Sequence, residues 1–292
     1  MGSSTQKPAY QNDQYWNARL EREFNLQGVG HADVSVAFNL WAYRVRKAVL
    51  LRALKQDAIP IEGARILELG FGTGYYLDLW RALNAGEVTG FDITHIAVQS
   101  AQERFKGLRW RLERADIGAP LDFAGVTGKY DLATAFDVLM HLVDDQKWNA
   151  ALDNIAAALR PGGYTMIFDK FQPLENAMSH SRRRSLATYR AALEARGFEI
   201  VAVKPLLFFM HSPVDYTGLK RFLAHSAWTL VKAPYKIGKR IGLGETFGGA
   251  MGALLYFPEL FLTATLPSGP SKKLLVARKR LTGGTPVLPS HD

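Results

Sequence analysis

Three glycines stand where a short apolar run changes into a helical pattern. The stretch ILELGFGTGYYLDLW, residues 66–80, contains Gly70, Gly72 and Gly74 within five residues. Glycine has no Cβ atom, so a ligand can approach the main chain closely at such a turn. In a strand–turn–helix unit, the same turn is where a nucleotide-like ligand meets backbone amides at a helix N-terminus. A plain tight turn is the alternative interpretation.

Polar side chains stand at the ends of the apolar runs that follow. Asp92 lies at the end of EVTGFDI, Asp116 ends LRWRLERAD, and His141 follows YDLATAFDVL. Carboxylates accept hydrogen bonds from ligand hydroxyl and amino groups. Histidine has an ordinary pKa near 6.5, which suits a general base near neutral pH. The spacing therefore indicates a ligand site at the ends of several strands.

The elements that must position these residues follow from hydrophobic periodicity. From residue 65 onward, short apolar runs alternate with amphipathic helical patterns, which is typical of a mostly parallel, doubly wound α/β sheet. The preceding residues 13–56 have helical spacing throughout. Strands are expected at 65–70, 87–93, 108–116, 130–139, 164–170, 198–209 and 272–280.

The glycine motif resembles motif I of the class I S-adenosylmethionine-dependent methyltransferases. It has the form E-x-G-x-G-x-G, from Glu68 to Gly74. A dinucleotide site would require G-x-G-x-x-G, but the sixth position counted from Gly70 is Tyr75, which is not small. FDVLMH at 136–141 and LRPGG at 159–163 also resemble that family. The resemblance covers about 61–204 plus the final strand, and it implies a Rossmann-like seven-stranded sheet of order 3-2-1-4-5-7-6.

The resemblance also implies S-adenosyl-L-methionine as the cofactor and a set of residues around it. Asp92 is expected to accept both ribose hydroxyls, Asp116 to contact the adenine amino group, and the Phe136 carbonyl to accept from the methionine ammonium. The alternatives are a helix cap for Asp92 and a turn aspartate for Asp116. The whole expected set is Tyr15, Trp16, Arg46, Glu68, Gly70, Phe71, Gly72, Gly74, Asp92, Ile93, Asp116, Ile117, Phe136 and Asp137.

Methyl transfer requires a proton acceptor if the methylated atom belongs to a hydroxyl. His141 is the first candidate, because DVLMHLVDD resembles a segment of many small-molecule and sugar O-methyltransferases. It could instead only shape the pocket. Asp169 and His180 are further catalytic candidates, each with a capping or surface role as the alternative. No His spacing or strand-end carboxylate cluster favours a metal site.

Composition limits the class of protein. The chain has 292 residues, 48% of them hydrophobic, and no cysteine, so disulfides and thiolate chemistry are excluded. A net charge of +9 favours contact with something anionic. No signal peptide pattern opens the sequence, and no nucleic-acid module is recognisable. We therefore expect a cytoplasmic protein, with membrane association as an alternative.

The largest departure from the family pattern is a long insertion before the last strand. We expect an N-terminal helical cap at 1–60, a cofactor-binding core at 61–208 and 271–281, and a helical insertion at 209–270. The insertion combines a basic amphipathic stretch with an apolar one that Pro258 and Glu259 are expected to break. It is either a lid over the acceptor or a contact, through 217–265, with an anionic membrane.

These observations favour one activity and leave others open. The favoured function is transfer of a methyl group to a hydroxyl of a small acceptor, such as a sugar, a glycolipid or a secondary metabolite. N-methylation needs the same cofactor site and is an alternative. The other alternative is a cofactor-binding module with a regulatory or interaction role and no turnover.

Overall fold

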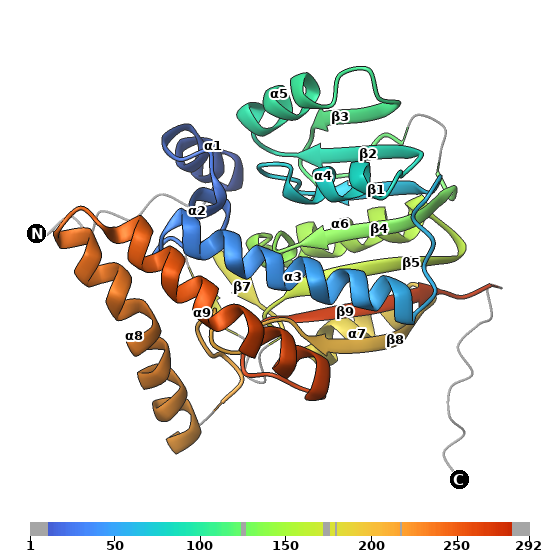
Figure 1. The fold of residues 1–292 in the computed structure, drawn as a ribbon. Helices are drawn as coiled ribbons and strands as arrows, with labels where there is room; N and C mark the ends of the chain where they lie inside the picture. The colour runs from blue at the N-terminus through green and yellow to red at the C-terminus, as the bar shows by residue number, and fades with distance from the viewer. Residues whose placement is uncertain (1–10, 124–126, 172–175, 179, 217, 282–292) are drawn as a thin grey trace, which may run out of the picture.

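A seven-stranded sheet forms the centre of the molecule (Figure 1). The computed structural model describes residues 11–123, 127–171, 176–178, 180–216 and 218–281. The sheet order is β3-β2-β1-β4-β5-β9-β8, which is the predicted 3-2-1-4-5-7-6 arrangement once the two strands outside this sheet are set aside. Its strands are β1 (Arg65–Leu69), β2 (Glu87–Asp92), β3 (Trp110–Arg114), β4 (Tyr130–Phe136), β5 (Leu159–Asp169), β8 (Phe198–Pro205) and β9 (Lys273–Lys279).

Strand direction places the ligand edge. The pairs formed among β1 to β5 are parallel, and β9 runs antiparallel between β5 and β8. The carboxyl ends of β1, β2 and β4 therefore meet at one edge. The fifth strand was expected to begin at residue 164, after Pro161–Gly163. β5 instead begins at Leu159, so Pro161–Gly163 lie inside the strand. A two-stranded hairpin of β6 (Asn176–Met178) and β7 (Ser181–Arg183), which was not predicted, follows β5.

Two apolar cores lie on the two faces of the sheet. Successive side chains of a strand point to opposite faces. Ile66 accordingly packs with α4 (Tyr75–Ala82) and α5 (His95–Arg104), whereas Leu67 and Leu69 pack with α6 (Asp145–Ala158) and α7 (Leu186–Glu194). Asp144 caps α6, since its carboxylate accepts from the amides of Gln146 and Lys147.

The N-terminal segment is helical, as predicted, but in three pieces. These are α1 (Asn12–Arg22), α2 (Leu26–Val29) and α3 (Val36–Gln56). Asn25 and Ser35 interrupt the predicted single run because each accepts main-chain hydrogen bonds as a helix N-cap. α3 lies along the same face of the sheet as α4, and α1 and α2 lie beyond its N-terminus near the carboxyl edge (Figure 1).

The residues between β8 and β9 form two long helices, α8 (Gly218–Arg240) and α9 (Gly244–Thr265). α9 packs along α3, and α8 packs against α9 (Figure 1). The prediction that Pro258 and Glu259 break the apolar stretch was wrong, because α9 continues through both. Proline removes one helical hydrogen bond, and packing against α3 holds the helix together across it. Among the described residues, α9 is the one helix long and apolar enough to cross a membrane by length and composition.

Candidate active site

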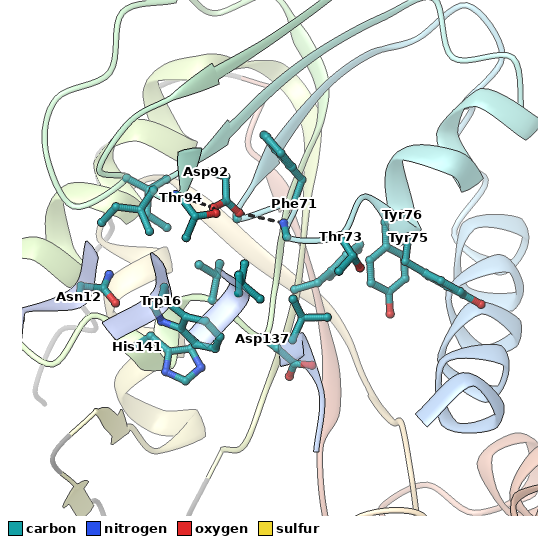
Figure 2. A pocket seen from close by; sticks show the side chains of 18 of the residues that line it. Asn12, Trp16, Phe71, Thr73, Tyr75, Tyr76, Asp92, Thr94, Asp137 and His141 are labelled. Atoms are coloured by element: carbon teal, nitrogen blue, oxygen red, sulfur yellow. Dashed lines mark hydrogen bonds between the residues drawn. The ribbon is translucent and has the colours of Figure 1, made fainter. Parts of the chain in front are cut away.

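A cavity opens at the carboxyl ends of β1, β2 and β4, beneath α1 (Figure 2). It comprises about 800 Å³, including space open to solvent. Its walls come from segments far apart in the sequence, so it is assembled only by the fold. The predicted site residues that line it are Trp16, Gly70, Phe71, Gly72, Asp92, Ile93, Asp116, Ile117, Phe136, Asp137 and His141.

The glycine turn requires the backbone conformations that glycine allows. Gly70, Gly72 and Gly74 have φ values of 71°, 52° and 77°, in the left-handed region that other residues avoid. A Cβ atom on Gly70 would lie 2.5 Å from a methyl carbon of Val138, and one on Gly72 would lie 3.0 Å from Val29. Gly70 and Gly72 line the cavity, whereas Gly74 does not and instead precedes the first residue of α4.

Asp92 is buried and tied to the glycine turn. Its Oδ2 atom accepts from the Gly72 amide at 2.8 Å, and its Oδ1 atom accepts from the amide and the hydroxyl of Thr94 at 2.9 and 2.8 Å (Figure 2). Burial raises its pKa, although these hydrogen bonds oppose the rise. The N-cap residue of α5 is Thr94, so Asp92 is not the cap of that helix. Its carboxylate faces the cavity next to the turn.

Asp116 has a local structural role as well as a place in the cavity wall. Its Oδ1 atom accepts from the Gly118 amide at 2.9 Å, as in a turn aspartate. Its Oδ2 atom lies 2.8 Å from the Lys147 ammonium. Ile93 and Ile117 line the same part of the cavity and supply apolar walls beside it.

His141 lies at the end of a short 3₁₀ turn, Leu139–His141, directly after β4. Its Nδ1 atom is 2.9 Å from the main-chain oxygen of His180. The Trp16 ring stands edge-on to the His141 ring at a centroid distance of 4.7 Å (Figure 2). Burial lowers the pKa of His141 from 6.5 to about 4, so the imidazole is neutral at physiological pH.

Asp137 links the cavity to a buried group of charges. It follows β4 with a φ of 61°, which is rare for a residue other than glycine. Its carboxylate lies 2.8 Å from Arg46 and 2.5 Å from Lys272. Burial opposes ionisation, but Lys272 and Arg46 hold the pKa of Asp137 down to about 2. Arg46 itself does not line the cavity and lies behind Asp137.

The other predicted residues also lie outside the cavity wall. Glu68 points into the core, where its carboxylate accepts from Trp80 Nε1 at 2.8 Å and from the Thr134 hydroxyl; burial raises its pKa to about 7. Asp169 is buried and accepts from the Tyr189 hydroxyl. Tyr15 and His180 stack on each other at 5.2 Å, and His180 contributes its main chain to His141.

Several cavity residues were not identified from the sequence. Tyr43 of α3 packs against Tyr75 with ring centroids 4.9 Å apart, and Thr73 stands inside the glycine turn itself. The position of Thr73 in the motif could have identified it, but no local pattern marks a residue that reaches the site from a distant helix. The complete group is Asn12, Leu20, Val29, Tyr43, Thr73, Tyr75, Tyr76, Thr94, Ala115 and Val138.

The part of the chain that the structure describes contains no group of three or more His, Asp or Glu side chains able to hold a metal ion. The cavity wall combines a glycine turn, the three carboxylates of Asp92, Asp116 and Asp137, a neutral imidazole and several aromatic rings.

Comparison with known proteins identifies the core of this fold. A family model described as a methyltransferase domain matches residues 66–163. Tenellin synthetase of Beauveria bassiana is 32% identical over an aligned length of 132 residues, and the alignment covers 42% of this chain and 3% of that protein. O-methyltransferase rstn1 of Aspergillus nomiae is 28% identical over 123 residues, which are 42% of this chain and 53% of that protein. The chain thus spans a small part of the first relative and about half of the second.

Solved structures share the fold at low identity. The 1,6-didemethyltoxoflavin-N1-methyltransferase of Burkholderia thailandensis has a TM-score of 0.52 and 15% identity, covering 94% of this chain and 93% of that one. The [4+2]-cyclase SpnF has a TM-score of 0.50 and 20% identity, covering 81% of each chain. The similarity extends over most of the chain, and it concerns architecture, because one fold carries different reactions.

Proposed function

We propose that this chain, which contains a class I S-adenosylmethionine-dependent methyltransferase domain, transfers a methyl group to a hydroxyl of a small acceptor. The observation that carries the choice of a hydroxyl is His141, a neutral imidazole in the wall of the cavity that also holds Gly72 and Asp92. The similarity to an O-methyltransferase supports the same choice.

The tautomer of His141 follows from its partner. A carbonyl oxygen can only accept, so the contact with the His180 oxygen requires the proton to be on Nδ1. In the neutral ring, Nε2 then has a free lone pair. His180 is therefore assigned a positioning role through its main chain, and His141 Nε2 is the proton acceptor.

The same cavity offers partners for each part of S-adenosylmethionine. Gly70 and Gly72 lie in the cavity wall and carry no Cβ atom, which suits close approach of a ligand to the main chain, and the Asp92 carboxylate suits a pair of ribose hydroxyls. Asp116 and the apolar walls of Ile93 and Ile117 suit adenine. Phe136 and Asp137, at the end of β4, are assigned to the methionine end.

Arg46 and Glu68 are assigned to positioning rather than to ligand contact. Arg46 holds Asp137 through a buried ion pair. Glu68 of β1 accepts a hydrogen bond from the Thr134 hydroxyl of the neighbouring strand β4. Asp169 is assigned to the β5–α7 packing through Tyr189. Tyr15 supports Trp16, whose ring covers His141.

The bound cofactor would supply a methyl group already activated by the sulfonium. Transfer of that methyl group to an acceptor oxygen, with cleavage of the carbon–sulfur bond, would make the hydroxyl proton strongly acidic, and His141 Nε2 would accept it. A base of low pKa suffices for such a proton. The products are a methyl ether, S-adenosylhomocysteine and an imidazolium that loses its proton to solvent.

Aromatic side chains exclude water from the reacting atoms. Trp16 from α1, Tyr43 from α3, and Tyr75 and Tyr76 from α4 line the cavity, and Tyr15 packs against Trp16 from outside the wall. Removal of water strengthens electrostatic contacts inside the site, and the aromatic walls would hold the acceptor in line with the methyl group.

We also propose that 1–60 form the cap, 61–208 with 271–281 the core, and 209–270 the insertion; of these, 1–10, 124–126, 172–175, 179 and 217 lie outside the described residues.

The test is turnover with S-adenosylmethionine carrying a ¹³C-labelled methyl group, across a panel of sugars, phenols and amines. Formation of S-adenosylhomocysteine together with a ¹³C signal of a methoxy carbon is the expected result. A signal of an N-methyl carbon would show instead that the acceptor group is an amine. Tight cofactor binding with no product from any acceptor class would indicate a binding module instead.

A further inference from the structure

Exposed large apolar side chains lie on both α8 and α9. Large apolar side chains usually lie inside a folded protein or at a contact site. Here six of them, from both helices, are each at least 67% exposed. We call this group the α8–α9 surface, and its residues are Leu219, Phe222, Leu230, Leu254, Phe257 and Phe261.

Each helix carries this surface on the side opposite its buried face. On α9, Leu254 and Phe261 are seven residues apart and lie on one face, with Phe257 between them. The buried residues Gly252 and Glu259 fall on the other face, where Gly252 packs against Trp41 of α3 and Glu259 binds the segment after β8. The exposed side chains therefore do not contribute to the packing of the insertion onto the core.

The charge beside this surface has one sign. The sequence has no Asp or Glu between Asp215 and Glu245. Lys220 and Arg221 are exposed in the first turn of α8, and Lys236, Lys239 and Arg240 are exposed in its last turns. Apolar side chains flanked by lysine and arginine match the surface of an anionic membrane, where charged headgroups lie over apolar acyl chains.

The contacts of α9 exclude a spanning orientation of this fold. Only 22% of its most apolar window is buried in the protein. However, the Glu259 carboxylate is fully buried and accepts from the amides of Phe208, Phe209 and Met210, at 2.7, 2.5 and 2.6 Å. Moving α9 into a bilayer would leave these amides and this carboxylate without partners, which is costly. In this fold α9 therefore does not cross a membrane.

We propose that the α8–α9 surface docks onto an anionic membrane, with the apolar side chains at the acyl boundary and the basic residues at the phosphate groups. A second copy of the chain fits less well, because it would bring the same unbalanced lysines and arginines together. The middle of α8 also lies beside the segment between α2 and α3, since the ring centroids of Trp228 and His31 are 5.1 Å apart. A lipid-linked acceptor would thus reach the site from the membrane.

Vesicle sedimentation of the full chain tests this inference without any need for turnover. Vesicles of phosphatidylglycerol and phosphatidylcholine are compared with vesicles of phosphatidylcholine alone, at low and high salt. The wild type is expected to bind the anionic vesicles, and less so at high salt. Lys236→Gln with Lys239→Gln and Arg240→Gln should weaken binding on the order of 100-fold, at about fivefold for each basic group.

Two further variants complete the test. Phe257→Ser with Phe261→Ser should also weaken binding, while a matched control, Lys106→Gln with Arg109→Gln and Lys129→Gln, removes the same charge from a distant exposed region and should bind like the wild type. Unchanged affinity for S-adenosylhomocysteine verifies that each variant is folded. A wild type that never co-sediments, or basic and control variants that bind alike, would overturn the proposal. A dimer seen by light scattering that Phe257→Ser with Phe261→Ser dissociates would assign the surface to a second copy instead.

Discussion

The Nδ1 atom of His141 donates a hydrogen bond to the main-chain oxygen of His180, 2.9 Å away. This contact joins the turn after β4 to the hairpin of β6 and β7, two segments that are 39 residues apart in the sequence. It fixes both the orientation of the imidazole and the position of its proton. The reactive Nε2 atom is thereby kept as an acceptor, and burial keeps the ring neutral.

The first prediction concerns the chemistry of this ring. His141→Ala and His141→Gln should lower kcat by roughly 10²–10⁴, with little change in the affinity for S-adenosylhomocysteine. The side-chain amide of Gln can donate a hydrogen bond, as His141 Nδ1 does, but it has no basic ring nitrogen to accept a proton. His141→Gln should therefore not rescue the rate. Steady-state kinetics and calorimetry on both variants check this. A kcat within a factor of a few of the wild type would make His141 a pocket wall.

The second prediction concerns the pH dependence of turnover. Since the pKa of His141 is lowered to about 4, the base remains unprotonated as the pH falls from 7 to 5. The ratio kcat/KM for a hydroxyl acceptor should therefore be nearly constant over that range. A base with an ordinary histidine pKa would lose half of its active form near pH 6.5. A pH–rate profile with a step near 6.5 would contradict the assignment.

The third prediction concerns stability in acid. Burial and the nearby Lys170 ammonium lower the pKa of His31 from 6.5 to about 4. The unfolded chain then binds a proton that the folded chain does not, so the stability present above pH 6.5 is lost as the pH falls through about 4. Over that window His31 should contribute a slope of about 1.4 kcal/mol per pH unit. His31→Asn keeps an acceptor for the Asp33 amide. When the free energy of unfolding is measured with urea at several pH values, this variant should lose that slope, and an unchanged slope would refute the prediction.

The fourth prediction concerns Glu68, whose pKa has the opposite shift. Burial raises it from 4.5 to about 7, so the stability associated with the protonated form is present below pH 4.5 and lost as the pH rises through about 7. Glu68→Gln keeps an acceptor for Trp80 and carries no charge, so it should be more stable than the wild type at pH 8. Thermal unfolding at pH 5 and pH 8 measures this. Glu68→Gln should also bind S-adenosylhomocysteine with the same affinity as the wild type. A large loss of affinity would mean that Glu68 contacts the ligand.

The fifth prediction concerns Asp92. Its replacement by Asn should weaken S-adenosylhomocysteine binding by about 1.5–3 kcal/mol, because charge-assisted hydrogen bonds to the ribose are lost. The exposed Asp122→Asn serves as the control for loss of one negative charge. Calorimetry on the two variants separates the effects. Equal affinity for Asp92→Asn and the control would limit Asp92 to holding the glycine turn.

Much of the fold could be predicted because its signals are local. The alternation of apolar runs with helical patterns specifies a parallel sheet, and the spacing of Gly70, Gly72 and Gly74 marks the strand-to-helix turn. Strand ends then meet at one edge, which is why Asp92, Asp116 and His141 lie around one cavity. These inferences need only the pattern within each segment and the geometry of a parallel sheet.

The remaining parts depend on contacts between distant segments. Tyr43 and Val29 reach the cavity only because α3 and α2 pack at its edge, and their local sequence resembles that of any buried helix. Arg46 has no local sign that Asp137 will pair with it. α9 continues through Pro258 because tertiary packing against α3 outweighs a local helix breaker.

The most direct test of the cofactor assignment is isothermal titration of S-adenosylhomocysteine into the wild type, Gly72→Val and Gly63→Val. Both glycines have positive φ values, 52° and 70°, so both substitutions strain the backbone, but only Gly72 lines the cavity. The account predicts one site on the wild type and on Gly63→Val, and no measurable binding to Gly72→Val, where the branched side chain would crowd Val29 in the cavity wall. A wild type that does not bind, or a Gly72→Val variant that binds as tightly as the wild type, would contradict it.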